Sequence, residues 1–142
     1  MSFIDHPAFL PIVLRIDAAT CVATGLLMTT GSSLVAGLTQ IPTELLMTAG
    51  ASLFPIAAFM AVVAARQPIW LPGLWLVVLG NVGWVLASLW LLTAGVIEPN
   101  ALGVAFVMLQ AAAVAMLAVL ETIGLGRSVR AHMSARNAGM AR

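Results

Sequence analysis

Four long apolar stretches dominate this sequence and leave few folds open to it. They run over about 10–38, 44–65, 71–94 and 101–124, and proline, glycine and polar residues separate them. A bilayer core about 30 Å thick needs roughly 20 mostly apolar residues per helix, and each stretch is long enough. None alternates polar and apolar residues as a membrane β-strand does. We therefore expect an all-α integral membrane four-helix bundle with four transmembrane helices, in a single domain over 1–142.

The composition agrees with a lipid environment and argues against other classes of protein. Of the 142 residues, 62% are hydrophobic and 8% are charged, whereas soluble domains contain about 25% charged residues. A net charge of +1 gives no general electrostatic basis for binding nucleic acid. The lipid bilayer is therefore the partner that the composition itself indicates.

The arginines indicate the orientation of the helices. Arg15 lies near the start of the first span and Arg66 lies between the second and third spans. The remaining arginines follow the fourth span: Arg127, Arg130, Arg136 and Arg142. The segments around Gln40 and Glu98 hold no cation, so the positive-inside rule predicts that both termini are cytoplasmic. Residues 125–142 are then a basic cytoplasmic tail.

Two carboxylates lie inside the apolar stretches. Asp17 is near the start of the first and Glu121 is near the end of the fourth. Ionisable groups in a span are costly and are functional candidates. In the predicted topology they share their depth with Arg15, Arg66 and Arg127, which predicts a charge layer where Arg66 and Arg127 neutralise the two acids. The alternative is a protonatable site that takes up and releases a proton during transport.

Uncharged polar residues also lie at membrane depth. Asn81 and Gln110 fall near the middle of the third and fourth spans, where their amides could bond each other and hold the helices together. Trp84 is one turn from Asn81 and shares its predicted interior face, either as packing or as the wall of a ligand pocket. Pro55 interrupts the second span, and a kink is expected there.

The residue types needed for common enzyme chemistry are missing from the spans. His6 and His132 lie in the end segments, so no histidine is placed to hold haem between helices. We find no Cys/His cluster for zinc, no phosphate-binding loop and no nucleophile elbow. We therefore expect a non-enzymatic protein without cofactor, metal site or catalytic residues.

Three functions fit such a chain. The first, which the missing chemistry favours, is an accessory or scaffold subunit that associates with another membrane protein or with itself through small-residue helix faces. The second is a minimal proton-coupled transporter that uses Asp17. The third is a lipid- or quinone-binding membrane module with Asn81, Trp84 and Gln110 as ligand contacts.

Two resemblances bear on these alternatives. In length, helix number and the acidic Asp17 in the first span, the chain is similar to the small multidrug resistance exporters, and this layout implies proton-coupled export. The likeness does not extend to a motif around Asp17, and the one-sided arginines differ from the balanced loop charge of those exporters. The chain also resembles four-helix proteins of bacterial inner membranes, which implies a multi-pass protein of the inner (cytoplasmic) membrane.

Overall fold

Apolar helices make up most of the computed structural model, which describes His6 and residues 8–140. The side chains at 131, 135, 136, 138 and 139 lie outside the described part, as does the whole of Arg142 in the predicted tail. The helices are α1 (Phe9–Thr30), α2 (Ser32–Thr39), α3 (Thr43–Ala65), α4 (Leu71–Thr93) and α5 (Ala101–Met140). Within the described residues there is no strand, and four helices, α1, α3, α4 and α5, are long and apolar enough to cross a membrane. The prediction of an all-helical chain with four apolar spans is confirmed.

The first predicted helix, 10–38, is divided at Gly31 into α1 and α2. The backbone of Gly31 leaves the helical region, with φ −98° and ψ 10°. A Cβ at this position would lie 2.7 Å from the carbonyl oxygen of Leu27, so the bend requires glycine. The apolar pattern continues unchanged across the break, and glycine is common in unbroken membrane helices. Hydropathy alone therefore did not reveal the division.

The last helix is longer than the sequence predicts. We expected a span that ends near residue 124, followed by a tail, but α5 continues without a break to Met140. The residues after 124 contain no proline and include alanine, arginine and methionine, which are good helix formers. The loss of hydropathy thus marks where the predicted span ends, while the helix itself goes on.

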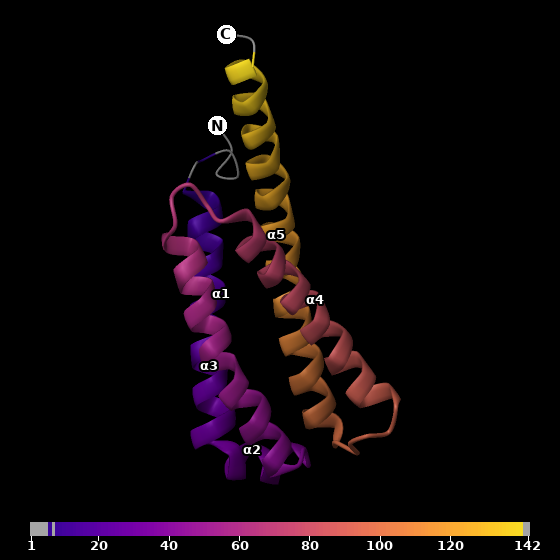
Figure 1. Ribbon diagram of the computed structural model, residues 1–142. Coiled ribbons are helices and arrows are strands. Elements are labelled where there is room, and N and C mark those ends of the chain that lie inside the picture. Colours follow the sequence, from indigo (N-terminus) through magenta and orange to yellow (C-terminus); the bar gives the residue numbers. More distant parts are fainter. Residues whose placement is uncertain (1–5, 7, 141–142) are drawn as a thin grey trace.

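The long helices associate as two pairs (Figure 1). α1 packs mainly on α3, and α4 packs mainly on α5, whereas α3 and α4 scarcely touch. The first pair is close because two glycines face each other: a Cβ on Gly25 would lie 3.0 Å from the carbonyl oxygen of Gly50. A Cβ on Gly50 would lie 2.8 Å from the Cβ of Met28. Small residues let helix backbones approach in this way.

Contacts of α5 with α1 and α2 join the two pairs. At one end, Asn100 donates from its side chain to the carbonyl of Leu38 at 2.8 Å and from its backbone to that of Thr39 at 3.1 Å. Its side-chain oxygen accepts from the backbone N–H of Gly103 at 2.9 Å, as an N-terminal cap of α5 does. Toward the other end, Gly124 leaves room for Leu10 of α1. The two pairs therefore contact each other through α5 near both ends.

Gly50→Ala should destabilise the protein by about 1–3 kcal/mol, because the added methyl group would overlap Met28 where α1 and α3 meet. The free energy of unfolding in mixed micelles measures the effect. Gly83→Ala is the matched control, since no atom lies within 4 Å of a Cβ built there. Equal stability of the two variants would contradict the close contact at Gly50.

Candidate functional site

Residues from three helices meet at one depth in the molecule. α1 begins at Phe9 and α4 at Leu71, at the same end. At 1.5 Å per residue, Asp17 lies about 12 Å and Asn81 about 15 Å from those starting points. α5 runs antiparallel to both and passes this level at Glu121. The helix register therefore brings an amide between two carboxyl groups.

The side chain of Asn81 bridges the two acids. Its nitrogen Nδ2 donates to Oδ2 of Asp17 at 2.7 Å and to Oε2 of Glu121 at 3.0 Å. Asp17 is 1% exposed and Glu121 is 0% exposed, so both are enclosed by protein. The second oxygen of Asp17 accepts from the thiol of Cys21 at 3.8 Å, while Oε1 of Glu121 is buried and has no hydrogen-bond partner among the described residues. We name Asp17, Asn81 and Glu121 the acid cluster.

The acid cluster is electrostatically incomplete within the described chain. Removing a carboxylate from water costs several kcal/mol unless a cation compensates, and two adjacent negative charges also repel each other. The hydrogen bonds that the described residues give these acids come from Asn81 and Cys21, which are neutral groups. The cluster can therefore retain its buried position by holding a proton or by binding a cation.

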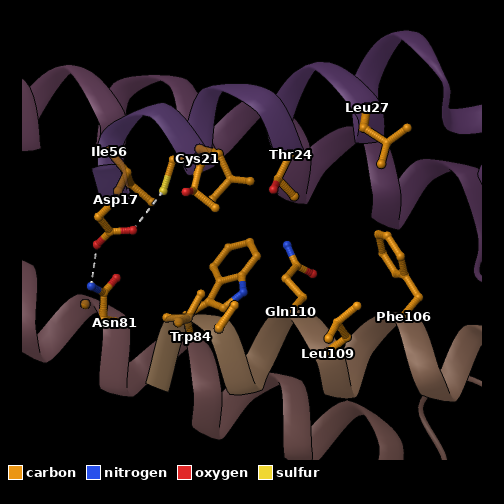
Figure 2. A pocket seen from close by; sticks show the side chains of 15 residues that line it. Asp17, Cys21, Thr24, Leu27, Ile56, Asn81, Trp84, Phe106, Leu109 and Gln110 are labelled. Carbon is orange, nitrogen blue, oxygen red and sulfur yellow. Dashed lines mark hydrogen bonds between the residues drawn. The ribbon is translucent and has the colours of Figure 1, made fainter. Parts of the chain in front are cut away.

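A cavity of about 250 Å³ adjoins the acid cluster between the two helix pairs. Asp17 and Asn81 form one part of its wall, and Figure 2 shows Asp17 bonded to both Asn81 and Cys21 there. Most of the other lining is apolar, and all four membrane-length helices contribute to it. Leu27 and Leu109 line the cavity and are exposed, so it reaches the surface of the molecule. Glu121 is buried and does not line this cavity.

A second cavity of about 180 Å³ lies farther along the same groove. It extends toward Ile41 and Ile97, at the opposite end of the helices from the starts of α1 and α4. The two cavities share three lining residues, Trp84, Phe106 and Gln110. These three side chains form the partition between a compartment at the acid cluster and a compartment nearer the other end.

The structure places the predicted charge layer differently from the sequence analysis. Within the described residues, both acids accept hydrogen bonds from Asn81, and neither forms an ion pair with Arg66. Arg15 and Arg66 are exposed, because they lie on the outer face of α1 and at the end of α3. Asp17 is only two residues from Arg15, about 3 Å along α1, but it lies on the buried face of the helix, where the neutral amide of Asn81 is its donor.

The expected bond between Asn81 and Gln110 is not formed. Gln110 precedes Glu121 by eleven residues on α5, about 16 Å along the helix. The amide of Gln110 contacts the sulfur of Met28 at 3.8 Å, and Asn81 is at the level of the acids. Counting residues from the helix ends would have placed Asn81 with Asp17. The lining role of Phe106 and Leu109 was missed because each is one apolar residue among many.

Comparisons with protein-family models, with curated proteins and with solved structures found no match to this chain. Among the described residues, no group of three or more His, Cys, Asp or Glu side chains could hold a metal ion. The chemistry that the site does offer is proton or cation binding beside an apolar cavity.

Replacing Asn81 tests the bridging amide. Asn81→Leu should lower the free energy of unfolding by about 2–5 kcal/mol, since both buried carboxyl groups lose the amide donor. Gln110→Leu removes an amide with one weak sulfur contact and should cost less than about 1 kcal/mol. The free energy of unfolding in mixed micelles measures both effects. Equal losses of stability in the two variants would show that the Asn81 bridge does not stabilise the protein more than Gln110 does.

Proposed function

We propose that this protein is a membrane carrier that exchanges a small lipophilic amine for protons at the acid cluster. The observation that carries the proposal is a pair of buried carboxyl groups, bridged by a neutral amide, of which one borders a largely apolar cavity. Such a site favours a ligand with an apolar body and a positive charge. A proton can occupy the acids when this ligand is absent.

Exchange follows from the geometry of Asp17. Its carboxyl group faces the cavity, where a ligand ammonium N–H can donate to it. The charge of the ammonium then compensates the acid pair, and the proton that the pair shared before is released to solvent. Asp17 on α1 bonds to Cys21 on the same helix and to Asn81 on α4. Glu121 on α5 bonds to the same amide of Asn81. Because Asn81 and Cys21 carry no charge, the ammonium group of the ligand and a proton compete to neutralise the same two carboxyl groups.

The two cavities supply a route. The compartment at the acid cluster and the one toward Ile41 and Ile97 are separated by Trp84, Phe106 and Gln110. A carrier needs a site that is closed on one side at a time, and a partition of side chains between helix pairs suits this. Because α3 and α4 make little contact, a change of tilt between the pairs would break few contacts on that side, with the contacts of α5 on α1 and α2 as the hinge.

We assign the four apolar helices to a bundle in the bacterial inner membrane with both termini in the cytoplasm. The arginines support this orientation, as does the common end of the molecule at which α1 and α4 begin and α5 ends. Large exposed apolar side chains, such as Leu79, Leu86 and Leu109, suit contact with lipid. The accessory or scaffold function, through a membrane partner or a homo-oligomer, stays a prediction, since these faces fit lipid and protein equally.

Amine binding should release protons. With N,N-dimethyl-phenylbutylamine as the probe, calorimetry in buffers of different ionisation enthalpy should give about one proton released per amine bound. Asp17→Asn should lower the affinity at least about tenfold, equivalent to one lost charge-assisted hydrogen bond, and abolish the release. Glu44→Gln, an exposed acid at the start of α3, is the control and should behave as the native protein.

Binding without proton release would identify the third alternative, a lipid- or quinone-type binding module. Native-like release from Asp17→Asn would remove Asp17 from the mechanism. Flux of the same amine in proteoliposomes with an imposed pH gradient completes the test, because a binding module gives no flux that depends on the gradient.

The orientation has its own test. A fluorescent protein fused after Arg142 should be bright in bacterial cells, and alkaline phosphatase fused there should be inactive, because the first folds in the cytoplasm and the second needs export. The same reporters inserted at Gln40 should give the opposite result. Active phosphatase at Arg142 would reverse the assigned topology.

A further inference from the structure

One hydrogen-bond donor at the cavity wall has no partner. The indole nitrogen Nε1 of Trp84 is buried, and no described group accepts its hydrogen. Figure 2 shows the Trp84 ring projecting into the space between Cys21 and Thr24 on one side and Gln110 on the other. Buried tryptophan N–H groups usually find an acceptor, so an orphaned one that borders a cavity marks a place for a ligand atom.

Two neighbouring polar side chains on the cavity wall are unbonded or only weakly bonded to the described protein. Threonines on α1 commonly donate to the backbone carbonyl four residues earlier, as Thr20 does at 2.8 Å and Thr29 at 2.7 Å. Thr24 lies between them on the cavity wall, and its hydroxyl makes no hydrogen bond within the described residues. Gln110 gives its amide to the sulfur of Met28, a weak acceptor, at 3.8 Å. Trp84, Thr24 and Gln110 thus form a donor-rich patch, which we name the donor subsite.

We infer that the donor subsite selects ligands that carry a hydrogen-bond acceptor, a carbonyl or ether oxygen, which takes the N–H of Trp84. This inference rests on the proposed function, because it assigns the second end of the amine bound at Asp17. The ligand is then bipolar: its ammonium meets the acid cluster, its apolar body fills the cavity, and its oxygen meets Trp84.

Helix geometry sets the spacing between the two polar ends. Trp84 follows Asn81 by three residues on α4, and Thr24 follows Asp17 by seven residues on α1. At 1.5 Å per residue, the donor subsite is about 5–10 Å from the acid cluster along the helix axes. A chain of three or four carbons between nitrogen and oxygen spans that distance, and the volume of about 250 Å³ admits one aromatic ring with it.

A matched pair of ligands tests the inference. N,N-dimethyl-phenylbutylamine lacks an acceptor, and its ketone analogue has a carbonyl in place of the methylene group beside the ring. Calorimetry with the native full chain in micelles should show the ketone binding about tenfold more tightly, since it satisfies a buried donor. Trp84→Phe keeps the aromatic ring and removes the N–H. It should bind both compounds with equal affinity, close to that of the native protein for the compound without the carbonyl.

The control is Trp90→Phe, which changes an exposed tryptophan on the same helix and should keep the tenfold preference. If Trp84→Phe keeps the preference, or if the native protein shows none while binding both amines, the donor subsite is wrong and the proton exchange at Asp17 stands. If neither amine binds the native protein, the proposed function fails and the inference fails with it. If Trp84→Phe has the thermal stability of the native protein, its loss of preference for the ketone does not come from misfolding.

Discussion

The arrangement of the membrane-length helices around the site depends on one amide group. Asn81 gives one hydrogen to a carboxyl group of α1 and the other to a carboxyl group of α5, so a single side chain of α4 links both helix pairs. The bond to Asp17 crosses between the pairs, and the bond to Glu121 stays within the second. Lipid-facing surfaces supply little preference for one helix arrangement over another, because lipid tails are as apolar as leucine. A directional polar contact at this depth therefore defines which faces meet.

The same contact connects stability with chemistry. A salt bridge in place of the amide would neutralise the acids permanently and leave nothing for a ligand to compensate. A leucine would leave Glu121 without a donor among the described residues and Asp17 with only the weak thiol donor of Cys21. Asparagine holds the carboxyl groups in position while leaving their charge unsatisfied, and the adjoining cavity gives one of them access to a small molecule. The orphaned oxygen of Glu121 and the orphaned nitrogen of Trp84 belong to the same incomplete polar set.

The sequence predicted the helical class and the four apolar spans because hydropathy and length determine them almost alone. It also singled out Asp17, Asn81, Trp84, Gln110 and Glu121, since polar groups at membrane depth are rare enough to stand out. Their partners were harder to predict. Pairing Asn81 with Asp17, and not with Gln110, requires the relative position of the helices along their axes to within one turn. Hydropathy defines the ends of each span less precisely than that. The break at Gly31 and the continuation of α5 to Met140 leave no hydropathy signal. The cavity arises from apolar residues whose faces only the packing reveals.

The unbroken length of α5 has a mechanical consequence. Glu121 and Met140 are on one rigid helix, nineteen residues and about 28 Å apart. A tilt of about 10° between the helix pairs, with its pivot at the acid cluster, would displace the end of that helix by about 5 Å, as rod geometry requires. Occupancy of a site inside the membrane would thus be converted into a movement far from it, large enough to be sensed by whatever touches the end of α5.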